Sequence, residues 1–457
     1  MDTHPTSPDS VTRQHPPRPG VPLLRGILPR LLRDPLKAYQ YIASHGDVAE
    51  YRFGGLRAFL ISRPDYIAEI FQRDNTVYTR SIFHERVKPV FGDGLLTSEG
   101  ESWRIQRRLI QPAFNKNRMA EFVGPITRAT SQMLAGWQPY AHSGTPVDMR
   151  QAVITLTQTV LVNTVFGARI SESELDDARA AVATINGALY PQLLFGWWKH
   201  LPLPGNRKCR QAIKMLEGLM HQVLRSKEAH SPDDNDLLSM LISARSPHCT
   251  DGMSALQLRD EMMTMFFAGH DTTATVLSWA LYLAQEHPNV LLRLQQEVDT
   301  TLAGRLPTAS DLDGLRYVRH VLEETMRLYP PAYVITRKAL TDSLIGPYVI
   351  PGEALIVISP YVMHRHPDYW EKPDVFDPER FNEDRSSGRH RYAYFPFAGG
   401  PRTCIGLHLA MTEAVLILSM IVQAYRFELV PHQNIRPQAR ATLRPNRQLF
   451  MYVATRA

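Results

Sequence analysis

Residues 395–406 read FPFAGGPRTCIG and place Cys404 in a glycine-rich loop, directly before an apolar segment from about Leu407 to Ala424. The apolar segment predicts a buried helix, so Cys404 would lie at its N-terminal end. The unpaired N–H groups and the dipole of a helix N-terminus lower the pKa of a thiol and stabilise a metal-bound sulfur. A free cysteine is also a common small core residue, and the loop composition alone leaves that interpretation open.

A long helix is predicted upstream, from Ala255 to about Glu286. Ser254 and Gln257 form a capping box at its start, and His287-Pro288 ends the helical pattern. The helix would be about 48 Å long at about 1.5 Å per residue. Because most of its circumference is apolar, we expect it to cross the centre of a large domain.

Within that helix, residues 268–273 read AGHDTT and combine a glycine, an acid and two hydroxyl side chains. A glycine inside a helix costs about 1 kcal/mol relative to alanine, so Gly269 needs a reason. Thr272 can bond the carbonyl of Ala268 one turn back and loosen the backbone, which would open a groove beside the helix. A simple kink with an exposed Asp271 is the alternative.

Both segments resemble signatures of the cytochrome P-450 family. The fixed positions of the family's cysteine loop are all filled, by Phe397, Gly400, Arg402, Cys404 and Gly406, and AGHDTT matches its oxygen-activation motif. The resemblance covers about residue 17 to the C-terminus. It implies a mainly α fold with small β-sheets, in which a long central helix lies over a buried haem b.

The resemblance also implies roles for these residues. Cys404 would be the thiolate ligand of the haem iron, with Phe397 and Gly406 beside the cofactor and Arg402 opposite a propionate. An axial thiolate favours cleavage of the O–O bond. Asp271 and Thr272 would deliver the protons that reduction of dioxygen requires.

Motifs outside these segments match further family positions. Trp103 and Arg107, four residues apart, and Arg337 correspond to propionate contacts, for which cationic groups are suited. Glu324-x-x-Arg327 corresponds to a buried ionic network that specifies the fold, joined by Arg380 from FDPERF at residues 376–381. Such spacings also arise by chance, and their place in the chain is what supports these assignments.

The substrate pocket is expected to be apolar. Segments that line the pocket in the family correspond to residues 83–96, 188–198, 265–268 and 333–335. The walls nearest the iron would be Phe266, Phe267, Ala268, Val334 and Ile335. We therefore expect an apolar small molecule held mainly by shape, such as a fatty acid, a terpenoid or a polyketide.

Composition narrows the class of protein. The chain has 457 residues, 44% hydrophobic and 21% charged, which is typical of a globular protein with a sizeable core. Its three cysteines form no CxxC pair, which argues against a disulfide framework or a zinc cluster and favours the cytoplasm. The net charge of +6 is modest and no basic-aromatic repeat suggests nucleic acid.

Residues 1–20 are polar and proline-rich, and we expect a disordered tail followed by a single domain over residues 21–457. No apolar run there resembles a membrane anchor, so we expect a soluble monomer of the bacterial type. Too few residues follow the cysteine loop for a fused reductase. We therefore expect electrons from a separate ferredoxin or flavodoxin and its NAD(P)H reductase.

The leading hypothesis is hydroxylation or epoxidation of the substrate with dioxygen. A haem-thiolate peroxygenase or isomerase is one alternative, but it would not need the pairing of Asp271 with Thr272. A non-enzymatic haem sensor or carrier is the other, because fold resemblance does not by itself establish function. A proton relay has little use in a carrier.

Overall fold

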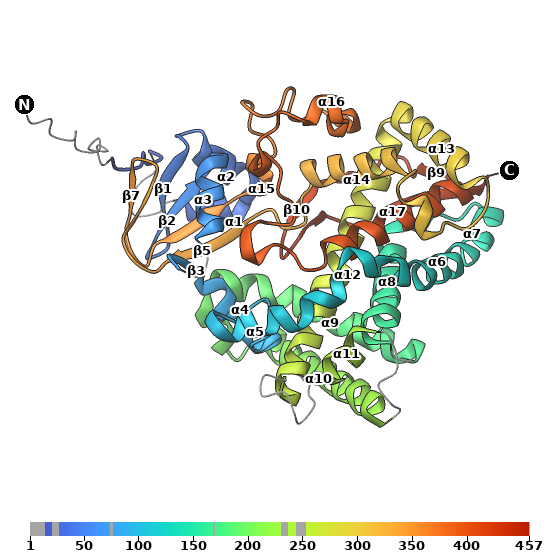
Figure 1. The fold of residues 1–457 in the computed structure, drawn as a ribbon, viewed down its shortest axis with the longest axis horizontal. Coiled ribbons are helices and arrows are strands. Elements are labelled where there is room, and N and C mark those ends of the chain that lie inside the picture. Colours follow the sequence, from blue (N-terminus) through green and yellow to red (C-terminus); the bar gives the residue numbers. More distant parts are fainter. Residues whose placement is uncertain are drawn as a thin grey trace, which may run out of the picture.

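The computed structural model describes residues 14–20, 27–73, 76–167, 170–229, 236–243 and 253–456. It is mainly helical with small β-sheets, which confirms the predicted fold class. Figure 1 shows the largest sheet at one end of the molecule, beside a larger helical part.

The longer helices are α6 (Met119–Ala135), α8 (Met149–Leu161), α9 (Glu172–Leu194), α10 (Pro204–Ala229), α12 (Ala255–Glu286), α13 (Pro288–Leu302), α14 (Arg316–Leu328) and α17 (Leu407–Ala424). The shorter helices are α1 (Leu28–Arg33), α2 (Pro35–Ala43), α3 (Pro64–Gln72), α4 (Ile82–Phe91), α5 (Gly100–Ile110), α7 (Gln138–Ser143), α11 (Leu237–Ser243), α15 (Pro360–Met363) and α16 (Glu383–Ser386).

The central helix is α12, and its predicted bounds are confirmed. The Ser254 hydroxyl accepts from the Gln257 N–H at 3.2 Å, and the Gln257 side chain accepts from the Ser254 N–H at 2.8 Å. Pro288 ends α12 by starting α13. Helices α8, α10, α14 and α17 pack around α12, which runs through the middle of the helical part (Figure 1).

The largest sheet has the strand order β1-β2-β8-β5-β3. Strands β5 and β8 pair antiparallel from Ile335 opposite Ile358. The β6–β7 hairpin lies between them in the chain, and Pro351-Gly352 links β7 to β8. The strands of the large sheet are β1 (Val48–Phe53), β2 (Leu56–Ile61), β3 (Tyr78–Arg80), β5 (Ile335–Ala339) and β8 (Leu355–Ile358).

Three smaller sheets complete the β structure of the described chain. One sheet has three strands in the order β4-β12-β9. The other two are hairpins, in which β6 pairs with β7 and β10 pairs with β11. The strands are β4 (Val147–Asp148), β6 (Ser343–Ile345), β7 (Tyr348–Ile350), β9 (Tyr425–Leu429), β10 (Pro437–Ala439), β11 (Leu443–Pro445) and β12 (Phe450–Thr455).

Helix α17 is the apolar segment that follows the cysteine loop. Among the described residues it is the one helix long and apolar enough to span a membrane, but most of it is buried. It packs against α6, α12, α13 and α14. Its apolar surface is therefore used in the protein core.

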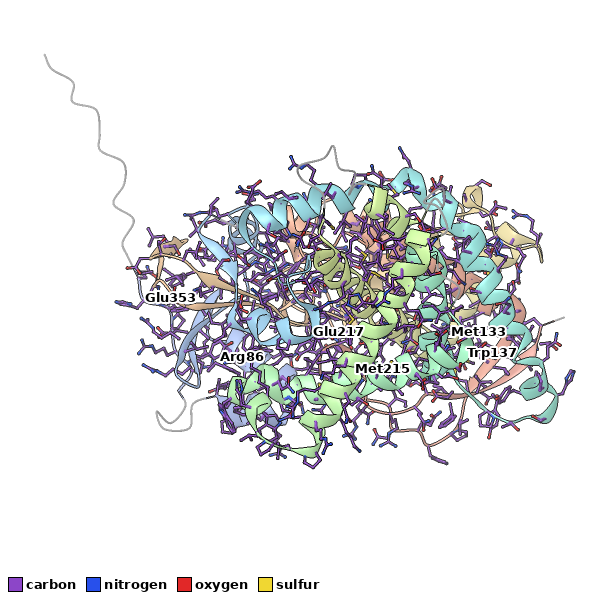
Figure 2. All side chains as sticks on the ribbon, turned by 90° about the horizontal axis from the view of Figure 1, so that it is seen from below. Arg86, Met133, Trp137, Met215, Glu217 and Glu353 are labelled. Carbon is purple, nitrogen blue, oxygen red and sulfur yellow. The ribbon has the colours of Figure 1, made fainter. Side chains whose placement is uncertain are left out.

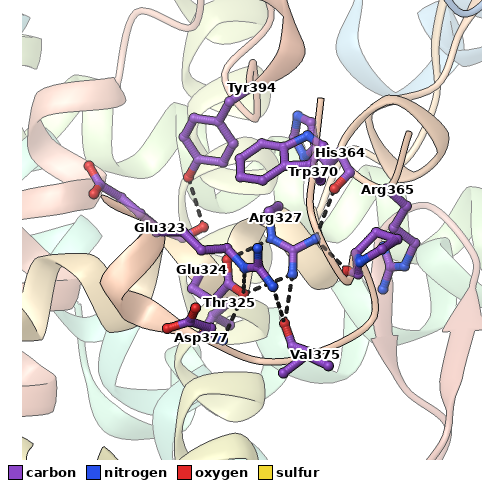
Figure 3. Close-up of polar contacts among 12 residues, drawn as sticks. Glu323, Glu324, Thr325, Arg327, His364, Arg365, Trp370, Val375, Asp377 and Tyr394 are labelled. Carbon is purple, nitrogen blue, oxygen red and sulfur yellow. Dashed lines mark hydrogen bonds and ion pairs between the residues drawn. The ribbon is translucent and has the colours of Figure 1, made fainter. Parts of the chain in front are cut away.

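A buried ionic network joins α14 to the segment before the cysteine loop (Figure 3). The Arg327 guanidinium donates to both carboxylate oxygens of Glu324, at 2.6 and 2.8 Å, and Arg380 lies 3.4 Å from the same carboxylate. Arg327 also donates to the carbonyls of His364 and Val375, at 2.9 and 3.0 Å. The structure thus brings together Glu324, Arg327 and Arg380, as the motifs predicted. Their contacts link α14 to the segments that carry His364 and Val375.

The N-terminal residues 14–20 contact the sheet-rich end. Gln14 donates to the Pro347 carbonyl at 2.9 Å, and Arg18 pairs with the buried Glu50 at 3.0 Å. These residues were expected to belong to a disordered tail, and that expectation is wrong for them because β1 and the β6–β7 hairpin hold them. Residues 1–13 lie outside the described residues.

Candidate active site

The cysteine loop turns tightly beside α3. Gly400 has a φ of +68°, and a Cβ there would lie 2.2 Å from the Phe71 carbonyl oxygen, so the position requires glycine. The Cys404 N–H donates to the Phe397 carbonyl at 2.9 Å. Gly406 precedes the first residue of α17, so Cys404 lies just before a helix N-terminus as predicted.

The Cys404 side chain has surface that is not covered by protein atoms. Its thiol is nevertheless surrounded by the protein and not by bulk solvent. Burial raises the pKa of its thiol, and the Gly406 N–H and the nearby Arg107 act in the opposite direction. The sequence argument expected a lowered pKa, and that direction is wrong because burial outweighs both groups. A metal cation bonded to the sulfur would reverse the direction, since a coordinating thiol is deprotonated.

Within residues 268–273 of α12, Ala268, Asp271 and Thr272 line an interior cavity, which Ala398 and Arg402 of the cysteine loop also line. The Thr272 hydroxyl donates to the Ala268 carbonyl at 2.8 Å, the bond that its spacing predicted. The backbone stays α-helical here. A Cβ on Gly269 would lie 2.8 Å from a methyl group of Leu161. Gly269 therefore allows α8 to pack closely on α12, which is a different reason from the expected groove.

Asp271 is held by a residue that sequence reasoning missed. The Thr442 hydroxyl, in the turn between β10 and β11, donates to the Asp271 carboxylate at 2.8 Å. Burial lowers the pKa of Arg444 of β11, and the nearby Asp271 carboxylate opposes this effect in part. No local pattern near Thr442 indicates this contact, because the partners are 171 residues apart.

A buried acid, Glu413 of α17, lies beside Thr273 of α12. Burial raises the pKa of Glu413 to about 8, and the neighbouring Thr273 hydroxyl lowers it in part. Glu413 is therefore mainly protonated at neutral pH. Sequence reasoning missed it, although a single acid within the run AMTEAVLILSM was a usable signal.

Cationic side chains gather on one wall of the cavity. Arg402 donates to the Ser98 carbonyl at 3.1 Å and stacks over the Trp103 ring at 4.3 Å, and Arg337 donates to the Thr336 carbonyl at 3.0 Å. His84 and Arg80 join them, and were not predicted. Burial, together with Arg80, Arg337 and Arg402, holds the pKa of His84 well below its usual range.

Arg107 lies at the cysteine loop. Its guanidinium donates to the Thr403 carbonyl at 2.8 Å, and its Nε donates to Gln111 at 3.1 Å. It is not among the residues lining the cavity, whereas Arg337 and Arg402 are. Arg107 thus braces the cysteine loop, and Trp103 supports Arg402.

The cavity itself has a volume of about 520 Å³ and mostly apolar walls. Phe267, Ala268, Val334 and Ile335 line it as predicted. Phe266 does not; it is 1% exposed and stacks on Phe166 at 6.4 Å, because successive residues of a helix point about 100° apart.

An arginine of α4 ties this helix to the end of α9, where Leu193 and Leu194 line the cavity. Arg86, labelled in Figure 2, donates to the Leu194 carbonyl at the end of α9 at 3.0 Å. Helix α10 runs along the outside in this view and carries the labelled Met215 and Glu217 (Figure 2).

The donor set fits haem b. The described residues contain no cluster of three His, Cys, Asp or Glu side chains that could bind a metal unaided. An accessible thiol inside the molecule can supply one ligand, and the cationic wall suits the carboxylates of a dianionic macrocycle. Cys404 would hold the iron, and Arg337, Arg402, Arg80 and His84 would face the propionates.

Comparisons with known proteins agree with this site. A model of the cytochrome P450 family matches residues 16–451. The chain is 33% identical to cyclooctat-9-en-7-ol 5-monooxygenase of Streptomyces melanosporofaciens, over 90% of this chain and 89% of that protein. It is 32% identical to cyclooctatin synthase of the same organism, over 96% of each chain. Pentalenene oxygenase of Streptomyces avermitilis is 28% identical, over 96% of this chain and 97% of that protein.

The fold comparison gives the same result. The crystal structure of the cytochrome P450DA haem domain superposes with a TM-score of 0.87 and 25% identity, covering 97% of this chain and 98% of that chain. The match spans both the sheet-rich end and the helical part. The cavity has apolar and cationic walls and is lined in part by the loop that carries the accessible cysteine. Together with the matches to known proteins, this shows that the chain belongs to the cytochrome P450 family and is a haem b monooxygenase.

Proposed function

We propose that this enzyme hydroxylates a terpenoid. The similarity to three bacterial terpenoid oxygenases over nearly the whole chain carries this proposal, and the apolar lining of the cavity supports it. In the reaction, the substrate C–H bond, dioxygen, two electrons and two protons give an alcohol and water. Fatty acids and polyketides have no comparable support among these relatives.

The haem iron, when bound, supplies the redox chemistry by which dioxygen is reduced and cleaved. Cys404 would hold it as a thiolate, and the Gly406 N–H donates to the Cys404 sulfur. Asp271 and Thr272 supply the protons from α12. Phe267, Val334 and Ile335 exclude water from the reacting carbon.

The electrons come from a separate ferredoxin or flavodoxin and its NAD(P)H reductase, and the enzyme acts as a soluble monomer with one domain over residues 21–457. The pairing of Asp271 with Thr272 favours this reaction over a peroxygenase or an isomerase, which needs no delivery of protons to dioxygen. Reduction by ferredoxin or flavodoxin is tested by following NAD(P)H consumption with each carrier.

The substrate class is tested by titrating the ferric holoenzyme with sesquiterpenes, long-chain fatty acids and macrolides, and following the spin state in the Soret band. A shift from low to high spin with sesquiterpenes alone supports the proposal, because an apolar ligand displaces water from the iron. A shift with fatty acids or macrolides and none with sesquiterpenes contradicts it.

A further inference from the structure

Four tyrosines from separate parts of the chain converge on the cavity. Tyr39 belongs to α2, Tyr51 to β1 and Tyr190 to α9, and Tyr333 precedes β5. All four line the cavity together with Arg440 from the turn between β10 and β11. Tyr39 packs against the apolar cluster that contains Tyr51 and also against the one that contains Tyr333.

The phenol groups are close to one another. Burial raises the pKa of Tyr39 well above its usual value, and Tyr51 and Tyr190 raise it further. The pKa of Tyr333 rises in the same way, through burial and then through Tyr39 and Tyr190. Arg440 stacks over the Tyr190 ring at 5.0 Å. The four phenols therefore stay neutral and form one polar patch in an otherwise apolar wall.

These hydroxyls differ from those of two tyrosines elsewhere in the molecule, which have a backbone acceptor. Tyr394 donates to the Glu323 carbonyl at 2.9 Å and Tyr425 donates to the Leu134 carbonyl at 2.7 Å. In the chain as far as the structure describes it, Tyr39 and Tyr51 interact with each other, but none of the four donates to a carbonyl or a carboxylate. On the wall of a cavity, a hydroxyl without a strong protein acceptor can form its hydrogen bond with a ligand or with water.

This patch is separate from the cationic wall that fits the propionates. The wall consists of Arg80, His84, Arg337 and Arg402, and the two groups share no residue. A neutral set of donors and acceptors suits an alcohol, which can donate to one phenol while accepting from another. A carboxylate would need a cation, and Arg440 is exposed and already stacked on Tyr190.

We propose that Tyr39, Tyr51, Tyr190 and Tyr333 form a subsite that binds a hydroxyl group already present on the terpenoid. This inference rests on the proposed function and narrows it to an oxygenated substrate. The enzyme would therefore act after a step that introduces the first oxygen, either a hydroxylation or a terpene cyclisation ended by water. The bound hydroxyl would fix which carbon of the skeleton is presented for oxidation.

The test compares a matched pair of ligands on the ferric holoenzyme, α-cedrene and cedrol, by Soret difference titration. Wild-type protein should bind the alcohol about tenfold more tightly than the hydrocarbon, which corresponds to about 1.4 kcal/mol. The double variant Tyr190→Phe/Tyr333→Phe should bind both ligands within about twofold of each other, with the affinity for α-cedrene unchanged.

Tyr361→Phe is the matched control, because Tyr361 is a phenol that packs near Tyr333 but does not line the cavity. It should keep the preference for cedrol. Unchanged α-cedrene binding shows that the double variant is folded. Equal affinities for both ligands in the wild type, or a cedrol preference that survives the double variant, would overturn the subsite.

Two further results separate this inference from the proposed function. If cedranoic acid binds most tightly and loses that advantage in Arg440→Gln, the patch recognises a carboxylate and the hydroxyl subsite is wrong. If no sesquiterpene of any kind shifts the spin state while fatty acids do, the terpenoid function fails, and the stated ligand of the patch fails with it.

Discussion

Cys404 and Asp271 owe their settings to groups that are distant in sequence. The carbonyl of Thr403, next to Cys404, accepts a hydrogen bond from Arg107, and Asp271 accepts from Thr442. The sequence motifs identified the first member of each pair through local spacing. Arg107 was predicted as a propionate contact and not as a partner of the cysteine loop, and Thr442 was not predicted, because a single hydrogen bond across the fold leaves no periodic signal.

The role of Cys404 is tested by Cys404→Ser. A serine hydroxyl is a far poorer iron ligand than a thiolate, so the variant should lose the red-shifted Soret band of the reduced carbon monoxide adduct. Cys209→Ser, which changes a buried cysteine of α10, should keep the band. An unchanged band in Cys404→Ser would assign the ligand to another residue.

Thr442→Val should impair proton delivery. Without the donor at 2.8 Å, the Asp271 carboxylate is free to turn away from Thr272, and product formed per NAD(P)H consumed should fall about tenfold. Substrate affinity should change little. Thr442→Ser keeps a hydroxyl and should therefore keep the wild-type ratio of product formed to NAD(P)H consumed. An equal fall of this ratio in both variants would mean that the shape of the side chain matters and the hydrogen bond does not.

At the scale of elements, the bounds of a helix could be predicted from the sequence where local residues determine where the helix begins or ends. The capping box at Ser254 and the proline at 288 gave both ends of α12, and the apolar run gave α17. The inward direction of Phe267 but not Phe266 depends on how α12 is rotated, which its nearly uniform apolar surface does not specify.

Helix packing predicts the effect of Gly269→Ala. Helix propensity alone would stabilise the variant by about 1 kcal/mol. The new methyl group would lie 2.8 Å from a methyl group of Leu161, and overpacking costs about 1–3 kcal/mol. The net free energy of unfolding should therefore fall, by up to about 2 kcal/mol. Urea unfolding measures this change.

The companion variant Leu161→Ala makes room for that methyl group. The double variant should therefore be less destabilised than the sum of the two single changes. Additive effects would show that the contact between α8 and α12 does not explain this glycine.

At the scale of the whole molecule, buried carboxyl groups make stability depend on pH. Burial raises the pKa of Glu261 and Glu413 to about 8 and that of Glu323 to about 7. In the folded state each keeps a proton that the unfolded chain releases above about pH 4.5. Stability from these groups is therefore full at low pH and falls as pH rises from about 4.5 to about 8.

Glu413→Gln should reduce this dependence, because glutamine stays neutral. Within this pH window, each group should lower the free energy of unfolding of the wild type by about 1.4 kcal/mol per pH unit. In the variant, the contribution of Glu413 to this fall should be absent. Urea unfolding of both proteins at about pH 6 and about pH 8 measures the difference. If the free energy of unfolding changes equally with pH in both proteins, Glu413 is already ionised in the folded state.

We propose above all that this chain inserts one atom of dioxygen into a terpenoid. The most direct test of this proposal is mass spectrometry of the product formed by the holoenzyme with a ferredoxin system, NAD(P)H and a terpenoid that shifts the spin state, under ¹⁸O₂. The account predicts a hydroxylated terpenoid carrying one ¹⁸O atom. A product whose new oxygen comes from water, or a rearranged product with no new oxygen, would contradict it.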